Sequence, residues 1–156
     1  MIAEGAREFV EALPDGGVLL GLDLGTKTIG TALCDEGWRF ATNAKTLPRG
    51  KFSRDKQELE GMISARSVTG IVIGLPRNMD GSEGPRAQSS RAYARNLSQA
   101  FGLPVLLWDE RWSTQAAEAA MIGQDMSRAK RADAIDSHAA AIILQGAIDR
   151  LAGGVL

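Results

Sequence analysis

Residues 18–34 have the sequence VLLGLDLGTKTIGTALC, and this stretch decides the expected fold. Its apolar first part, Val18–Asp23, is bounded by turn-forming residues and predicts a fully buried strand. The glycine-containing segment 24–27 predicts a turn, and residues 28–34 predict a second strand that returns beside the first. Residues 38–47 alternate in part and predict a third strand. Together the three strands predict an antiparallel meander.

Two further apolar runs, IVIGLP (71–76) and PVLLWDE (104–110), predict buried strands that alternate with helices. Strands connected in this way are usually parallel and covered on both faces. The expected helices are 54–67 with Ser53 as N-cap, 85–101, a helix capped by Ser113 or Thr114 that runs to 122, and 132–151, with residues 123–131 as a loop.

The sequence therefore predicts an α/β fold with a mixed five-stranded sheet. Three strands form the antiparallel meander, two strands are parallel, and helices cover both faces. Residues 1–17 are expected to form an N-terminal helical extension, and residues 18–152 a single domain.

Composition narrows the range of functions. The single cysteine, Cys34, excludes a disulfide framework, and the single histidine, His138, leaves at most one imidazole for a catalytic triad or a metal. No apolar run reaches the ~18 residues of a membrane span, and the first residues do not resemble a secretory signal. A cytoplasmic setting without membrane contact is expected. The net charge of −1 argues against binding nucleic acid through bulk charge but allows a local basic patch.

Acidic residues occur where such a sheet usually binds ligands, at the carboxyl ends of its strands. Asp23 ends the first strand, where an unpaired carboxylate would cost several kcal/mol. Asp109 and Glu110 end another strand, and only one of them can share a face with Asp23, because neighbouring strand residues point to opposite faces. In the last helix Asp136 heads an apolar face, with Asp133 as the alternate. Capping, salt bridges or the helix dipole would also explain each acid.

Basic and polar residues gather in the loops near these acids. Arg91 and Arg95, for example, lie one helical turn apart. We expect the group to bind nucleic acid, with Arg77, Arg91, Arg95, Lys130 and Arg131 contacting backbone phosphates more than bases. Its members are Lys27, Arg77, Asn78, Arg91, Arg95, Arg111, Lys130 and Arg131.

Taken together, four segments resemble the YqgF (RuvX) family: GLDLGTKTIG (21–30), IVIGLPRNMDG (71–81), DERWSTQAAE (109–118) and DAIDSHAAAIILQ (133–145). The resemblance covers about residues 18–150. It implies an RNase H-like fold and a nuclease that matures the 5′ end of pre-16S ribosomal RNA, in a family first predicted to resolve Holliday junctions. Arg77 and Trp112 depart from the apolar residues usual at their positions, which concerns substrate contacts rather than the acids.

By this resemblance, Asp23, Glu110 and Asp136 are the catalytic acids and hold Mg²⁺ or Mn²⁺. Crowded carboxylates favour a divalent cation because it relieves their mutual repulsion, and hard oxygen ligands suit both metals. Two ions about 3.5–4 Å apart would activate water and stabilise the leaving oxygen of a phosphodiester.

The expected substrate is structured nucleic acid, first of all pre-16S rRNA, free or within a ribosomal particle. Resolution of Holliday junctions in branched DNA is the alternative, and it requires a symmetric homodimer rather than a monomer. A phosphotransferase of the actin and kinase type would need a second lobe, for which 156 residues leave no room. A non-catalytic ribosome-assembly or nucleic-acid-binding factor is the remaining alternative.

Overall fold

The computed structural model describes residues 1–14, 16–111 and 128–153, and in the last helix it describes side chains from His138 onward. The strands are β1 (Ile2–Ala3), β2 (Leu19–Leu24), β3 (Thr28–Cys34), β4 (Ala41–Pro48), β5 (Gly70–Leu75) and β6 (Val105–Asp109). The helices are α1 (Ala6–Ala12), α2 (Phe52–Arg66), α3 (Pro85–Phe101) and α5 (Arg128–Ala152). The expected helix over 113–122 lies outside the described residues.

The described strands form one sheet in the order β1-β6-β5-β2-β3-β4. Strands β2, β3 and β4 form the predicted antiparallel meander, and β5 and β6 join it in parallel. The expected count of five strands is wrong, because Ile2–Ala3 adds a sixth strand parallel to β6. This segment was expected to be helical, and the helix begins only at Ala6.

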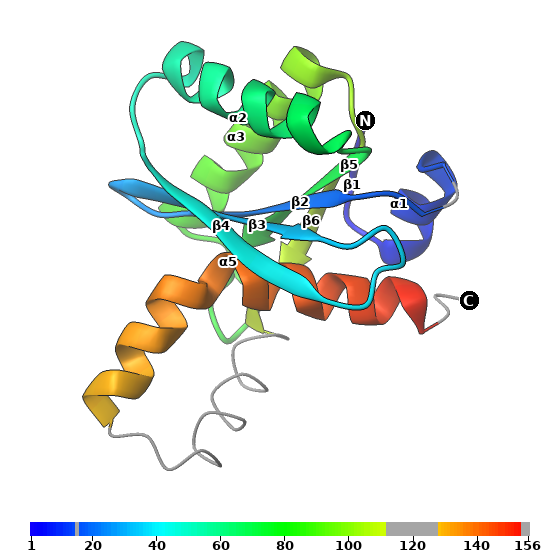
Figure 1. Ribbon diagram of the computed structural model, residues 1–156. Coiled ribbons are helices and arrows are strands. Elements are labelled where there is room, and N and C mark those ends of the chain that lie inside the picture. Colours follow the sequence, from blue (N-terminus) through cyan, green and yellow to red (C-terminus); the bar gives the residue numbers. More distant parts are fainter. Residues whose placement is uncertain (15, 112–127, 154–156) are drawn as a thin grey trace.

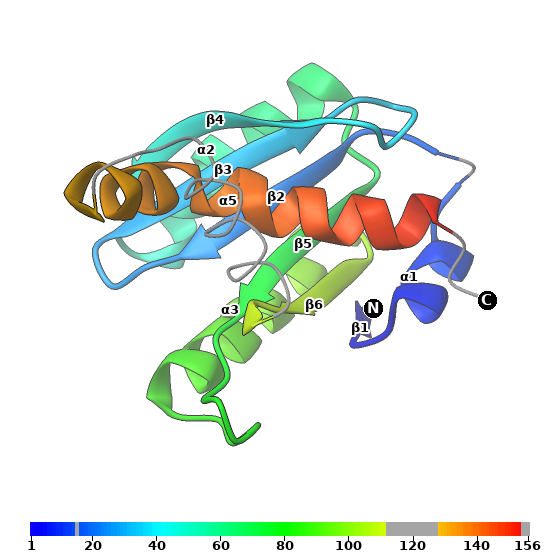
Figure 2. The same ribbon diagram turned by 90° about the horizontal axis from the view of Figure 1, so that it is seen from below.

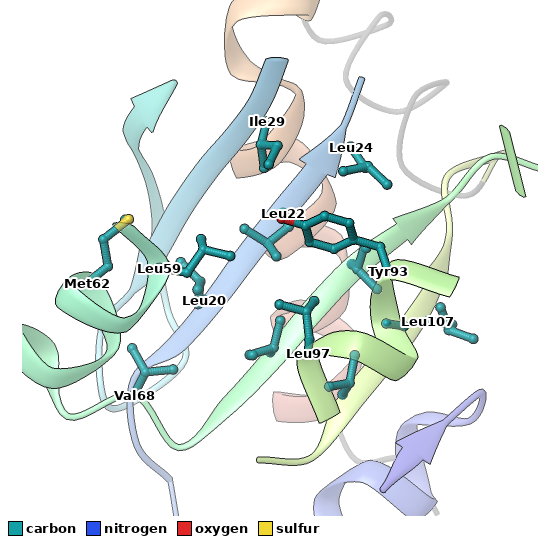
Figure 3. Packing of buried hydrophobic residues seen from close by; sticks show 14 of the residues in the cluster. Leu20, Leu22, Leu24, Ile29, Leu59, Met62, Val68, Tyr93, Leu97 and Leu107 are labelled. Carbon is teal, nitrogen blue, oxygen red and sulfur yellow. The ribbon is translucent and has the colours of Figure 1, made fainter. Parts of the chain in front are cut away.

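Helices cover both faces of the sheet, as Figure 1 shows: α2 and α3 lie on one side and α5 on the other. The side chains of β2 alternate between the two cores, because successive strand residues point to opposite faces. Leu20 and Leu22 pack among residues of α2 and α3, as Figure 3 shows, whereas Leu19 packs with Leu144 of α5. The expected apolar face of the last helix is confirmed: Ala140, Ile143 and Ala147 are buried against the sheet.

Several element ends differ from those expected. The third strand begins at Ala41 rather than residue 38, because Asp35 organises a longer turn by accepting hydrogen bonds from the backbone N–H groups of Arg39 and Phe40 at 2.8 and 2.7 Å. Helix α2 has Lys51 as its N-cap, not Ser53. Helix α5 begins at Arg128, so the expected loop 123–131 is wrong over its last four residues.

The carboxyl ends of β2, β5 and β6 lie at one edge of the sheet, because the three strands are parallel neighbours. Helix α5 runs across this part of the sheet and extends past its edge (Figure 2). None of the described helices combines the length and the apolar character that crossing a bilayer requires.

Candidate active site at the carboxyl edge of the sheet

The two acids that follow β6 separate to opposite faces, as the alternation predicts. Asp109 is 3% exposed and shares the face of Leu107, which packs among residues of α2 and α3. The Glu110 backbone N–H continues the ladder by donating to the Leu75 carbonyl at 3.2 Å. The Glu110 side chain lies over Gly74 on the α5 face. Glu110 is thus the acid that reaches Asp23.

Asp23 and Glu110 form a hydrogen-bonded pair of carboxyl groups. Burial raises the pKa of Glu110 to about 7, the negative charge of Asp23 acts in the same direction, and the positive charge of Arg86 opposes both. Two carboxyl groups this close oppose each other's ionisation, so the pair keeps a proton to higher pH than an isolated carboxyl group does. A divalent cation would replace that proton and allow both groups to carry charge.

Two glycines allow this crowded arrangement. A Cβ added at Gly74 would lie 2.9 Å from Glu110 Cγ and Cδ and 2.7 Å from Ile143 Cδ1. A Cβ at Gly21 would lie 2.7 Å from Leu144 Cβ. The glycines therefore let α5 and the Glu110 side chain lie directly on the sheet.

Helix α5 brings the position of the third predicted acid near the pair. Ala140 lies over Gly30, the residue that pairs with Asp23 across β2 and β3. Position 136 is one helical turn before Ala140, on the same stripe of the helix. The side chains of Asp136, Asp133, Lys130 and Arg131 lie outside the described residues, so the structure does not show their contacts.

The pair of acids suits a hard cation. Asp23 and Glu110 offer carboxylate oxygens, which Mg²⁺ and Mn²⁺ prefer. Within the described part of the chain, no group of three or more His, Cys, Asp or Glu side chains could hold a metal ion.

Asp109, on the other face, holds a loop rather than facing the pair. Arg111 binds it with two donors, Nε to Oδ1 at 3.0 Å and Nη2 to Oδ2 at 2.6 Å. The Arg111 guanidinium holds the pKa of Asp109 below its usual range. Arg111 Nη1 also donates to the carbonyls of Asn78 and Met79 at 3.4 and 3.3 Å. The Asp109–Arg111 pair thus fixes the loop after β5.

Besides Arg111, two further arginines of the expected nucleic-acid contacts are already engaged with acids of this chain. Arg91 binds Glu83 at 2.6 Å and Glu4 at 2.8 Å. Arg77 lies 3.3 Å from the same Glu83 and 3.7 Å from Asp109. These ion pairs lower the positive charge that both arginines present to a ligand. Lys27, Asn78 and Arg95 are exposed.

Arg49 and Arg86 are two more cations at this end of the sheet. The sequence places Arg86 among the basic residues near the acids but outside the expected nucleic-acid contacts, and it does not point to Arg49. Arg49 follows β4, whose last residue Pro48 pairs with Thr28, so the hairpin register places it at the same edge. Arg86 stands in the first turn of α3 and acts on the pKa of Glu110. The register of the β3–β4 hairpin could have pointed to Arg49, because Pro48 pairs with Thr28 and Arg49 is the next residue.

Comparison with known proteins agrees with this architecture. The family model "RuvX: Holliday junction resolvase" matches residues 17–150. A protein of Novosphingobium aromaticivorans named "Putative pre-16S rRNA nuclease" is 65% identical over 153 residues, 98% of each chain. One of the same name from Sphingopyxis alaskensis is 62% identical over 97% of this chain and 99% of its own.

Solved structures of low sequence identity share the fold. Thermus thermophilus RuvC in complex with a Holliday junction substrate aligns with a TM-score of 0.55 at 14% identity, over 88% of this chain and 96% of that one. The yeast mitochondrial Holliday junction resolvase aligns with a TM-score of 0.52 at 13% identity, over 96% and 85%. These alignments confirm the expected RNase H-like architecture. With the match over residues 17–150 and relatives above 60% identity, the chain belongs to the RuvX family.

Proposed function

We propose that this protein is a nuclease that hydrolyses phosphodiester bonds in structured RNA and processes the 5′ end of pre-16S rRNA. The observation that supports this most is the hydrogen-bonded pair of Asp23 and Glu110 at the carboxyl edge of the sheet. The names of relatives that match nearly the whole chain favour pre-16S rRNA as the substrate.

In this proposal Asp23, Glu110 and Asp136 hold Mg²⁺ or Mn²⁺, as one or two ions. When bound, such ions activate water and stabilise the charge that develops on the leaving oxygen. Asp23 and Glu110 release their shared proton and present carboxylate oxygens. The absence of a Cβ at Gly74 leaves the space that the Glu110 side chain occupies. His138 is exposed, and the proposal requires no histidine base.

Holliday junction resolution is the second candidate, favoured by the description of the family. Cutting a four-way junction symmetrically needs two active sites and hence a stable homodimer. Processing one end of an RNA needs a single site and is compatible with a monomer acting on free RNA or on a ribosomal particle. We place either activity in the cytoplasm, where the single buried thiol of Cys34 stays reduced.

The test compares two substrates under one set of conditions. Precursor RNA that spans the 5′ end of 16S rRNA, and a four-way DNA junction, are incubated with the protein and Mg²⁺ or Mn²⁺. We expect cleavage of the RNA and no paired nicks in the junction. Paired nicks in the junction would support the resolvase if sedimentation with the junction also shows that the protein is a dimer. Binding without cleavage of either substrate would support a non-catalytic factor.

The matched variants are Glu110→Gln and Glu60→Gln. The first removes the charge of the proposed ligand and should abolish cleavage. The second changes an exposed glutamate of α2 and should leave cleavage unchanged. Equal cleavage by both variants would remove Glu110 from the mechanism.

A further inference from the structure

A pocket that holds two arginines lies at the same carboxyl edge of the sheet as the acid pair, on the side covered by α3. Its volume is about 210 Å³. The end of β2 forms one wall through Leu24, whose side chain points to the face opposite that of its neighbour Asp23. The positive charge of Arg86, another lining residue, nevertheless acts on the pKa of Glu110. The other walls are the residue after β4 and the first turns of α3. The lining residues are Leu24, Gly25, Thr26, Arg49, Pro85, Arg86 and Ser89.

Arg49 is fixed in this pocket by neutral partners. Its Nη1 donates to the Gly25 carbonyl at 2.7 Å, and its Nη2 donates to Ser89 Oγ at 2.9 Å. The guanidinium carbon lies 5.9 Å from the centre of the Tyr93 ring. Tyr93 in turn donates to Asp55, which also accepts from the Gly50 backbone N–H. The side chain is therefore held in one orientation while its charge is not neutralised by these partners.

Arg86 is the second cation of the pocket, and its hydrogen-bond partner there is also neutral. Its Nη2 donates to the Leu24 carbonyl at 3.4 Å, and the side chain is exposed to solvent. Neither Arg49 nor Arg86 forms an ion pair within the described ranges 1–14, 16–111 and 128–153, in contrast to Arg77, Arg91 and Arg111. Two cations thus face one pocket at the edge of the sheet that also carries the acid pair.

We propose that the pocket of Arg49 and Arg86 binds a backbone phosphate of the substrate strand, next to the phosphate that is cleaved. This inference rests on the proposed nuclease function and identifies how the strand is held. Guanidinium groups bind phosphate oxygens with several donors in a fixed geometry. Because a phosphate is present in every nucleotide, the contact fixes the position of the strand without reading its sequence. Arg49 and Arg86 would be binding residues that position the scissile bond over Asp23 and Glu110.

The experiment uses a series of otherwise identical RNA–DNA strands, each with one uncharged methylphosphonate linkage at a different position around the cleavage site. With the wild-type protein we expect one position beside the cleaved bond to raise KM roughly tenfold, the loss of one charge-assisted contact. Arg86→Ala should raise KM by a similar factor on the unmodified strand and show no further penalty at that position. In Arg86→Lys the methylphosphonate at that position should again raise KM, though less than in the wild type, because the lysine restores the positive charge.

Arg66→Ala is the matched control, since Arg66 is exposed at the far end of α2, away from the pocket. This variant should keep the full penalty at the same position. Arg49→Ala removes bonds that support the loop, so its folding is checked by urea unfolding, and Arg49→Gln replaces it if it is unfolded. The proposal would be overturned if the methylphosphonate at this position raised KM as much in Arg86→Ala and in the Arg49 variant as in the wild type.

A binding measurement separates this inference from the nuclease function itself. Glu110→Gln, which should not cleave, is titrated with the same labelled strands, and binding is followed by fluorescence anisotropy. If the wild type cleaves RNA but no methylphosphonate position couples to Arg86, the pocket proposal fails and the nuclease function stands. If the wild type cleaves nothing but the coupling is seen in binding, the nuclease function fails and the phosphate pocket stands.

Discussion

At the scale of single residues, the raised pKa of Glu110 defines the behaviour of the site. A glutamate side chain in water has an ordinary pKa of 4.5, and burial and the charge of Asp23 raise the pKa of Glu110 to about 7 in the folded protein. Between these two values the folded state holds a proton that the unfolded state has lost. Stability therefore falls as pH rises from about 4.5 to about 7, because the unfolded state is the one that ionises more easily.

Glu110→Gln should remove this dependence. We expect the variant and the wild type to unfold alike at pH 4.5, and the variant to be more stable at pH 8 by on the order of 2 kcal/mol in the absence of divalent ions. Urea unfolding at the two pH values measures the difference. A wild-type stability that rises between pH 5 and 8 relative to the variant would contradict a shared proton at this pair.

Gly74 offers a steric test of the same pair. In Gly74→Ala the new methyl group would lie 2.9 Å from Glu110 Cγ and Cδ, so the side chain must move and cleavage should fall at least about tenfold, since small misplacements at a reacting site are costly. Gly61→Ala is the control, because no atom lies within 4 Å of its added Cβ. That change should raise helix stability by up to about 1 kcal/mol. Equal cleavage rates in the two variants would show that Glu110 need not lie over Gly74.

The sequence was sufficient to predict that Asp109 and Glu110 point to opposite faces of the sheet, because successive residues of a strand alternate between its faces. It did not show which of the two meets Asp23 without the family resemblance, since that depends on the register of β5 and β6. It also could not show that Arg77 and Arg91 bind Glu83, or that Glu4 reaches Arg91, because these contacts depend on the tertiary packing of the chain.

At the scale of elements, the strand meander and α3 were predictable because each has a strong period and clear turn or proline signals. The two-residue strand β1 was not, because two residues have no period and its pairing with β6 spans about a hundred residues. The start of β4 was missed because the hydrogen bonds of the Asp35 carboxylate extend the preceding turn.

Helix α5 carries the next prediction. Position 136 shares the stripe of Ala140, Ile143 and Ala147, which lies on the sheet, whereas position 133 is rotated away from it. Asp136→Asn should abolish cleavage with folding intact and substrate binding within a few-fold of the wild type. Asp133→Asn should keep most activity. The reverse order in cleavage assays would show that the assignment of the acid in α5 is wrong.

At the scale of the whole molecule, charge is distributed unevenly although its net value is −1. On α3, Arg91 is bound to Glu83 and Glu4, whereas Arg95, one turn later, is exposed. Arg95 therefore presents more uncompensated positive charge to a phosphate than Arg91 does.

Salt dependence distinguishes these two arginines. If Arg95 contacts a phosphate, Arg95→Ala should reduce the steepness of the fall in log affinity with log salt concentration by roughly one. Arg91→Ala should change the slope by much less, because its charge is already compensated. Affinities of a labelled precursor RNA at several salt concentrations provide the slopes. A larger change for Arg91→Ala than for Arg95→Ala would contradict this distribution of charge.

The proposed mechanism requires that Asp23 and Glu110 hold a divalent cation in place of the proton that the pair otherwise keeps. Calorimetric titration of Mn²⁺ into the folded protein, in two buffers of different ionisation enthalpy, measures binding and proton release together. We expect the wild type to bind Mn²⁺ and release a substantial fraction of one proton per molecule at pH 7, falling toward zero at pH 8.5, because the pKa of Glu110 is about 7. Glu110→Gln should bind at least about tenfold more weakly without this release. No heat of binding to folded wild type, or the same binding and proton release in Glu110→Gln, would contradict the claim.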